Sequence, residues 1–259
     1  MKKSKIFLIT FLVVVLGFIG IGMVMGIIEG AKNPTVDGYV YTLKDDGTFA
    51  LKRPADGEPR KEVEIPAEVK GKPVTSIESG AFEDNTVLEK VIIPSSIKVV
   101  NGFSGCTALK SVTLPKGVEK IEQGAFQNCT ALTEIEIPET VTVIGSDAFS
   151  GCTSIQSFNW PVTVNRIDFD TFKGCTNLSE IVIPEGVEVV NCTFEGCTSL
   201  TELSLPSSVT EIWSFSECES LVRINYKGTM EQWESMHGSQ DVNGNCVVHC
   251  TDGTISDLD

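Results

Sequence analysis

The residues best suited to chemistry are nine cysteines and two histidines. Both histidines, His237 and His249, lie near the C-terminus, and His249 stands between Cys246 and Cys250. Thiolate and imidazole are ligands that zinc prefers. The C-x2-H-C spacing is unfavourable, however, because neighbouring side chains on a strand point to opposite faces. The sequence therefore favours a packed terminal strand over a zinc site, and it predicts neither a metal nor a cofactor.

A second group of ligand-type residues overlaps this run. Asp241, Asn243 and Asn245 resemble the start of a calcium-binding loop, and Asp252 follows further along the chain. Cys246 occupies the position at which such a loop needs Gly. A turn rich in Asn and Gly is therefore the favoured interpretation.

Familiar catalytic motifs are missing from the sequence. No G-x-S-x-G, H-E-x-x-H or G-x-x-x-x-G-K-[ST] pattern occurs, so neither a nucleophile elbow, a zinc-protease helix nor a phosphate loop is predicted. The net charge of -15 also argues against nucleic-acid binding, because phosphates require a basic face. We therefore expect neither an enzyme nor a nucleic-acid-binding protein.

Six of the nine cysteines recur at one position of an internal repeat. The simplest interpretation is a ladder of small apolar side chains. Disulfides between adjacent turns are an alternative, although their geometry is demanding and six like side chains point the same way. A metal is not expected there, because no mixed ligands accompany the thiols. Cys192 falls outside the ladder, in a loop of variable length, and is the best candidate for an exposed thiol. The ladder cysteines are Cys106, Cys129, Cys152, Cys175, Cys197 and Cys218.

The repeat has a length of 21 to 23 residues. Each turn places a Cys three residues after a Phe, a Leu or Ile three residues later, and in most turns a Pro six residues after that; Asn85 replaces Cys in the first turn. All variation in length falls just before the next Phe, so this step marks an outer loop. Seven turns are present, with Phe82, Phe103, Phe126, Phe149, Phe172, Phe194 and Phe215.

One such repeat cannot bury its apolar side chains alone, whereas stacked turns form a continuous core. Around each Pro the sequence alternates as a strand does: Ile135 and Ile137 are expected to point inward, and Glu134 and Glu136 outward. The Pro ends the strand because it has no N–H to donate. The pattern predicts a right-handed, curved, β-rich solenoid whose convex segments are short helical, 3-10 or extended pieces.

The repeat resembles the BspA-like, or Treponema-type, leucine-rich repeats, with the approximate pattern C-x-x-L-x-x-I-x-I-P-x-x-V-x-x-I-x-x-x-A-F. The resemblance covers about residues 63–226 and involves five or six fixed positions in each turn. Asn85 in the first turn and Trp160 in the fourth depart from the pattern. The resemblance implies an extracellular leucine-rich-repeat solenoid used for protein or matrix binding and adhesion.

Five segments are predicted along the chain. Residues 37–62 are expected to form a capping hairpin, because alternating strands flank an Asp-Asp-Gly turn. Beyond the repeats, Met230, Trp233 and Met236 recur every third residue and predict a short helix over the other end. The segments are 1–29 (cytoplasmic lysines and a transmembrane signal-anchor), 30–36 (linker), 37–62 (hairpin), 63–226 (repeats) and 227–259 (C-terminal cap).

The N-terminus predicts attachment to a membrane. Lys2, Lys3 and Lys5 precede an uncharged stretch at 6–28, which is long enough to cross a bilayer as a helix. The stretch exceeds the apolar region of a secretory signal, so an uncleaved anchor is favoured and a cleaved, secreted form is the alternative. The positive-inside rule places the lysines in the cytoplasm and the rest of the chain outside a bacterial cell.

The outward side chains of the predicted strands are the candidate binding site. In a curved solenoid such strands line the concave face, which is the customary binding surface. The expected partner is a host matrix, cell-surface or envelope protein; the alternative is a structural envelope scaffold without a specific soluble ligand. The candidate residues are Lys90, Ser111, Thr113, Glu134, Glu136, Ser157, Asn159, Glu180, Glu202, Ser204, Arg223 and Asn225.

Overall fold

A computed structural model describes residues 33–191, 193–213, 215–239, 242 and 245–256. The predicted membrane segment at 6–28 and the candidate exposed thiol Cys192 lie outside these residues. Among the residues that are described, no helix has the length and apolar character needed to cross a membrane.

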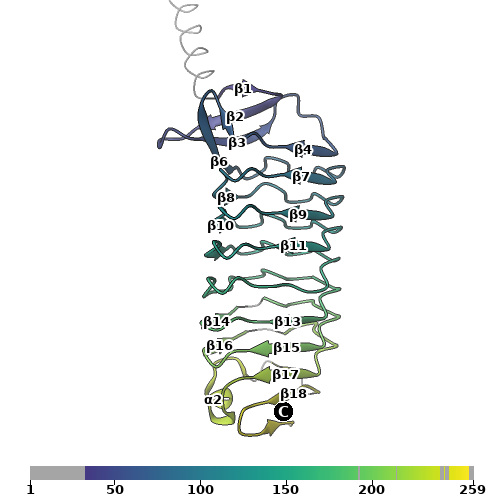
Figure 1. The fold of residues 1–259 in the computed structure, drawn as a ribbon. Coiled ribbons are helices and arrows are strands. Elements are labelled where there is room, and N and C mark those ends of the chain that lie inside the picture. Colours follow the sequence, from purple (N-terminus) through teal and green to yellow (C-terminus); the bar gives the residue numbers. More distant parts are fainter. Residues whose placement is uncertain (1–32, 192, 214, 240–241, 243–244, 257–259) are drawn as a thin grey trace, which may run out of the picture.

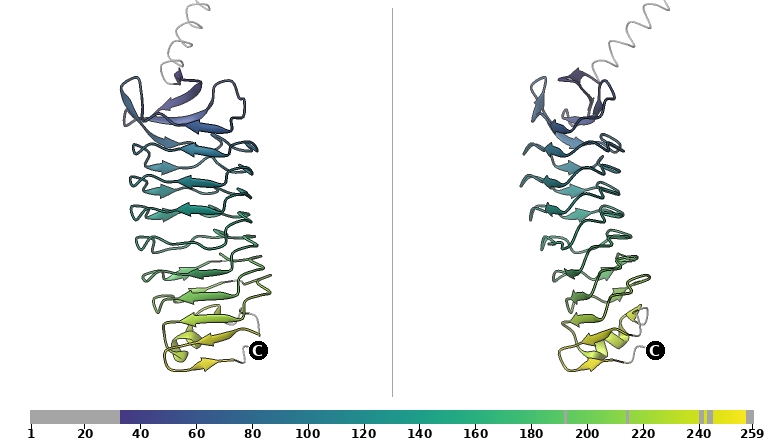
Figure 2. Two further views of the ribbon diagram at one scale, coloured as in Figure 1. Left: turned by 45° about the vertical axis from the view of Figure 1, so that its right-hand side comes forward. Right: turned by 90° about the vertical axis from the view of Figure 1, so that its right-hand side faces the viewer.

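The repeats form a solenoid, as the sequence predicts, and the turns stack into an elongated column (Figures 1 and 2). Most turns contribute two short strands, one on each of two faces, and successive turns pair in parallel. The chain between these strands runs through turns, and within the described part of the repeats none of it is helical. The convex segments are therefore turns and extended pieces rather than helices.

The first face, which we call the strand face, carries the strand that precedes each Pro. Its ladder extends beyond the seven turns of the sequence repeat, because β4 adds a strand before the first turn and β18 adds one after the last. The strands are β4 (Glu62–Glu64), β7 (Lys90–Ile92), β9 (Ser111–Thr113), β11 (Glu134–Glu136), β13 (Glu180–Val182), β15 (Glu202–Leu205), β17 (Arg223–Tyr226) and β18 (Val247–His249).

The second face carries the strand that follows each Pro. Its ladder begins in the N-terminal cap and continues from β6 to β8, β10 and β12, and a separate pair, β14 and β16, resumes it further along. These strands are β6 (Lys72–Ile77), β8 (Val99–Val100), β10 (Lys120–Ile121), β12 (Val143–Ile144), β14 (Val189–Val190) and β16 (Glu211–Ile212).

The N-terminal end is covered by an antiparallel hairpin of β2 (Tyr39–Leu43) and β3 (Phe49–Pro54), with β1 (Thr35–Val36) beside it. β3 then pairs in parallel with β6, whose start is also paired with β5 (Glu68–Val69). The second-face sheet thus continues into the hairpin, and the first turn has no open edge on that face.

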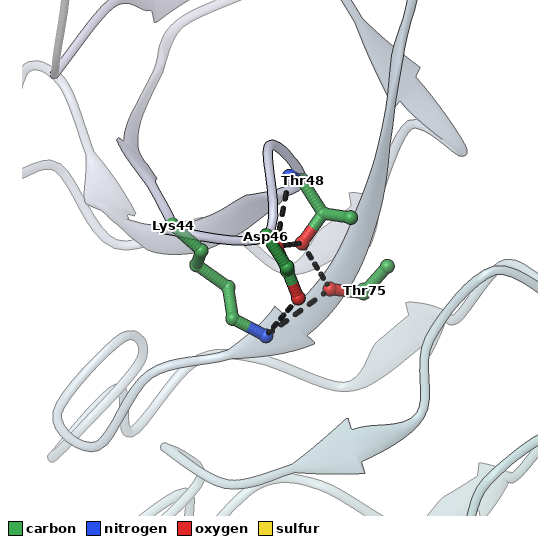
Figure 3. A network of polar contacts seen from close by, with 4 residues as sticks. All are labelled: Lys44, Asp46, Thr48 and Thr75. Carbon is green, nitrogen blue, oxygen red and sulfur yellow. Dashed lines mark hydrogen bonds and ion pairs between the residues drawn. The ribbon is translucent and has the colours of Figure 1, made fainter.

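A polar network fixes the turn of this hairpin to the first repeat (Figure 3). The Asp46 carboxylate accepts hydrogen bonds from the backbone N–H and the hydroxyl of Thr48, at 2.9 and 2.6 Å. These hydrogen bonds lower the pKa of Asp46. The Thr48 hydroxyl lies 2.8 Å from that of Thr75 on β6, and Lys44 Nζ donates to Thr75 at 3.4 Å. The network therefore connects the two strands of the hairpin with the solenoid.

At the C-terminal end a helix and a hairpin close the column. Helix α2 (Met230–Ser235) begins with a capping box, in which Thr229 and Gln232 satisfy each other's backbone N–H groups. Trp233 on this helix is buried with its ring centroid 5.6 Å from that of Tyr226. β18 then turns back antiparallel into β19 (Thr254–Ile255).

The repeated phenylalanines form a stack along the core. Consecutive rings from Phe82 to Phe194 lie 5.3 to 6.3 Å apart between centroids, with interplanar angles of at most 15°. These centroid separations lie within the range found for offset-stacked aromatic pairs. The stack therefore runs through the core from the first turn to the sixth.

The six ladder cysteines do more than fill space. Each thiol is buried and donates an S–H hydrogen bond to the carbonyl of the Phe in the preceding turn, at 2.9 to 3.2 Å. In the first turn the side-chain amide of Asn85 makes the equivalent bond to the Arg60 carbonyl, at 3.3 Å. All six thiols are free, so the alternative of disulfides between turns is wrong.

Removing one of these donors tests their contribution. Cys152→Val fills the site but removes one of the two hydrogen bonds to the Phe126 carbonyl, which keeps the bond from the Cys129 N–H. We therefore expect a loss of about 0.5–1.5 kcal/mol in the free energy of unfolding. Cys152→Ser keeps a donor and should lose less. Urea unfolding followed by circular dichroism measures both. Equal stability of wild type and Cys152→Val would show that the thiol is only an apolar filler.

Burial of the thiols also predicts alkaline sensitivity. It raises the pKa of Cys197 to about 12 and of Cys218 to about 11 from an ordinary value of 9.0, and it raises the pKa values of Cys152 and Cys175 well above 9.0. As the pH rises, the thiols of the unfolded chain ionise before those of the folded protein. The contribution of the buried thiols to the free energy of unfolding is therefore fully present below pH 9, and it is lost as the pH rises towards their pKa values in the folded state. Each thiol should reduce stability by about 1.4 kcal/mol per pH unit in that range.

Urea midpoints between pH 8 and 11 measure this slope. The double variant Cys152→Ser, Cys175→Ser removes two of the titrating groups and should fall less steeply than wild type, whatever its stability at pH 8. A slope unchanged by the double variant would assign the alkaline loss to other groups.

Candidate functional site

All twelve candidate residues lie on the strand face. Nine of them are exposed, and Glu202, Ser204 and Asn225 are half-buried. Their side chains alternate with buried aliphatic ones, such as Val112 and Ile181, that point into the core. The face occupies one long side of the column rather than the inside of a horseshoe (Figure 2).

The parallel register arranges these side chains in two columns along the solenoid. On the N-terminal half, Ser111 lies beside Glu134 and Thr113 beside Glu136. On the C-terminal half the first column runs through Glu180, Glu202, Arg223 and Val247, and the second through Val182, Ser204, Asn225 and His249. Neighbours in a column are separated by one strand spacing, about 4.8 Å.

The columns are interrupted at Ser157 and Asn159. Both residues are exposed on the face, but residues 157–159 form no strand pairing with β11 before them or β13 after them. The structure therefore gathers the candidate residues into two paired blocks with an unpaired turn between them.

Three of the candidate carboxylates on this face are available to a ligand. Glu134, Glu136 and Glu180 are exposed, and their side chains have no hydrogen bond or ion pair with any residue that the structure describes. Glu202 differs, because it accepts a short hydrogen bond from the Asn225 side-chain amide. Carboxylates that lack an internal partner keep their capacity for contacts with another molecule.

The cations of the face are similarly free. Lys90 and Arg223 have no ion pair within the described residues, whereas Lys98, Lys173 and Lys227 on other surfaces each pair with a glutamate. An unpaired guanidinium presents up to five N–H donors in a plane. The face therefore exposes both acidic and basic side chains that have no ion pair within the described residues.

Some residues of this surface were not among the candidates. Thr201, Val222, Val247 and His249 join Glu202 and Arg223 around a shallow open depression near the C-terminal end. Val182 and Val222 are 60% and 54% exposed and offer apolar area on this surface. The repeat pattern includes Val182 and Val222 and could have indicated them. The pattern ends before β18, so it gave no reason to place His249 beside Asn225.

Charge is distributed unevenly along the column. Residues 33–120 contain 13 acidic and 12 basic residues, whereas residues 121–259 contain 21 acidic and only 4 basic residues. A surface potential depends on this summed charge as well as on individual contacts. The C-terminal half thus carries nearly all of the net negative charge.

The C-terminal cysteines and histidines are not gathered into one cluster. Cys246 is buried, and His249 is exposed on β18 with its Nδ1 atom 3.4 Å from the Thr254 hydroxyl. No group of three or more His, Cys, Asp or Glu side chains suited to a metal occurs among the described residues. Asp241 and Asn243, from the suggested calcium loop, lie outside those residues.

Thiol labelling distinguishes the cysteines. In a folded Cys192→Ser variant at pH 8, we expect only the half-buried Cys250 to react promptly with a disulfide reagent. The ladder thiols should not react, because burial keeps them protonated and inaccessible. Absorbance of the released thiolate counts the reactive groups, and the variant unfolded in urea provides the reference. Ladder thiols that react equally fast in folded and unfolded protein would contradict their burial.

Comparison with known proteins agrees with this geometry. The model of the BspA-type leucine-rich repeat region matches six copies, over residues 61–153, 100–221 and 172–237. No curated protein matches the chain at a significant level.

Two solved structures are similar over most of this chain. A leucine-rich repeat protein of T. pallidum is 31% identical and has a TM-score of 0.66, with 73% of this chain and 91% of that chain covered. A leucine-rich repeat protein of Bacteroides ovatus is 26% identical with a TM-score of 0.63, and the match covers 74% of this chain but 55% of that one. The chain therefore belongs to the BspA-type leucine-rich repeat family.

Proposed function

We propose that this protein is a cell-surface binding module that attaches to a protein or matrix ligand through the strand face. The observation that carries the proposal is the set of free charges on this face. Glu134, Glu136, Glu180, Lys90 and Arg223 are ordered by the strand register, yet have no ion pair among the described residues. Exposed charges held on a rigid scaffold favour a complementary partner by limiting the entropy lost on binding.

The distribution of charge favours a partner with a basic surface. Glu180 and Glu202 lie in the half of the solenoid that contains 21 acidic and 4 basic residues. A field of this sign attracts a basic partner over a distance of about 8–10 Å at physiological salt. The exposed valines Val182 and Val222 would add apolar contact area once the partner has docked.

We further propose that the solenoid is displayed outside a bacterial cell. This part of the proposal is supported by the sequence, in which three lysines precede the uncharged stretch at 6–28. The solenoid begins soon after that stretch, so an anchor there would hold the N-terminal cap near the membrane and the acidic half away from it. A binding role is preferred to catalysis because no histidine occurs in residues 63–226.

Reversal of the four glutamates tests the face. The variant Glu134→Lys, Glu136→Lys, Glu180→Lys, Glu202→Lys should bind a surface coated with solubilised animal extracellular matrix about tenfold or more weakly than wild type at low salt, because the electrostatic attraction is lost. Surface plasmon resonance at low and physiological salt measures retention and its salt dependence. Circular dichroism checks that both proteins are folded.

The matched control makes the same change in charge elsewhere. Glu188, Glu217, Glu219 and Glu234 are exposed and lie off the strand face, so their reversal to Lys should leave binding within about twofold of wild type. Equal losses in both variants would mean that net charge, and not this face, mediates attachment. Wild-type protein that binds neither matrix nor host-cell extract would favour the envelope scaffold.

A further inference from the structure

The fourth turn departs from the others at the two inward positions of its strand. Phe158 and Trp160 stand where neighbouring turns have Ile135 and Ile137 before them, or Ile181 and Ile183 after them. Both aromatic side chains are buried, with only 5% and 8% of their surface exposed. The Trp160 indole N–H is buried without a hydrogen-bond partner. The turn thus places two large rings in space that its neighbours fill with aliphatic side chains.

These rings pack edge-on rather than in the stack. The Phe158 centroid lies 4.7 Å from that of Phe172 at 69°, and the Trp160 centroid lies 5.5 Å from that of Phe172 at 81°. A ring turned on edge needs more height along the solenoid than one stacked in parallel. Overpacking of this kind forces backbone shifts. The pairing of the fourth turn with its neighbours is accordingly disrupted.

On the strand face, the backbone groups of residues 157–159 pair with neither β11 nor β13. One bond remains at the beginning of the segment, where the Ser179 N–H donates to the Gln156 carbonyl at 3.1 Å. On the second face, the sheet ends at β12, and the fourth turn contributes only an isolated bridge between Ile167 and Val190. Both ladders are therefore interrupted at the same turn (Figure 1).

The third side of the column is continuous through this turn. Phe126 and Phe149 remain stacked at 5.7 Å, and Phe149 and Phe172 at 5.5 Å. The backbone N–H of Phe126 donates to the Ala148 carbonyl at 2.9 Å, and that of Phe149 to the Thr171 carbonyl at 3.0 Å. The Cys152 and Cys175 thiols also keep their hydrogen bonds to the preceding turns.

We propose that the fourth turn is a hinge at which the column bends about its phenylalanine side. Two sides of the column lack their ladder bonds there, and the third side holds the turns together. The blocks on either side, β4 to β11 and β13 to β18, each keep a parallel ladder and move as units. Hinge motion between rigid blocks is a common means of fitting a surface to a ligand. The inference concerns the fold and holds whether or not the strand face binds a partner.

Hydrogen exchange on the full-length wild-type protein tests the hinge directly. The amides of residues 157–160 should show protection factors at least about tenfold lower than those of residues 111–113 and 203–205, because the latter lie in paired strands. Mass spectrometry with overlapping peptides resolves these segments. Equal protection in the three segments would overturn the proposal.

A variant tests the cause. In Phe158→Val, Trp160→Ile the aliphatic pattern is restored, and protection at 157–160 should rise by about tenfold, the effect expected from one recovered hydrogen bond. The matched control Ile135→Val, Ile137→Val changes the same positions of the preceding turn and should leave protection at 157–160 unchanged. A folded aromatic-to-aliphatic variant that stays unprotected would show that the rings do not open the ladder.

The motion itself is measured between spin labels on the two blocks. Labels at Thr113→Cys and Ser204→Cys, in a background of Cys192→Ser and Cys250→Ser, lie four strand spacings apart, about 19 Å between backbones. The ladder thiols are buried and should not take the label. The distance distribution from pulsed electron paramagnetic resonance should narrow when Phe158 and Trp160 are replaced as above. Distributions of equal width would refute hinge motion.

Discussion

The constraint on which this structure depends is the height of one turn. Parallel strands stack about 4.8 Å apart, so each interior side chain must fit within a layer of that thickness. Phenylalanine satisfies the limit by stacking its ring against the next, with centroids 5.3 to 6.3 Å apart. Cysteine satisfies it by being small. Its S–H group adds a second hydrogen bond to a Phe carbonyl of the preceding turn that already accepts one from a backbone N–H. Where the limit is exceeded, at Phe158 and Trp160, both ladders are interrupted.

Most of the fold could be predicted from the sequence because the repeat encodes it locally. The alternation around each Pro predicts which side chains enter the core, and Val112 and Ile181 are buried where the pattern places them. The hydrogen bonds of the thiols were not predicted, because a cysteine fits a purely apolar interpretation equally well. Asn85 was the available signal: a polar side chain at a ladder position indicates that the position needs a donor.

The residues of the candidate site could be predicted from the sequence, but their positions relative to one another could not. Outward positions such as Glu134 and Ser111 follow from the period of two along a strand, and the structure places them on one face. The break at Ser157 and Asn159 depends on how two aromatic rings pack against Phe172, and a residue-type pattern contains no such information. The pairing of β18 with β17, which brings His249 beside Asn225, likewise arises from the cap and has no repeat to indicate it.

The thiol ladder also affects how this chain must be made. Nine reduced cysteines in an oxidising compartment would form disulfides with one another while the chain is unfolded. Once a turn is in place, its thiol is buried against the preceding Phe carbonyl and is no longer exposed to an oxidant. The stacking of a turn therefore also protects its thiol from oxidation, and each added ladder turn buries one more sulfur. If the chain is exported as proposed, the solenoid must assemble faster than its cysteines are oxidised.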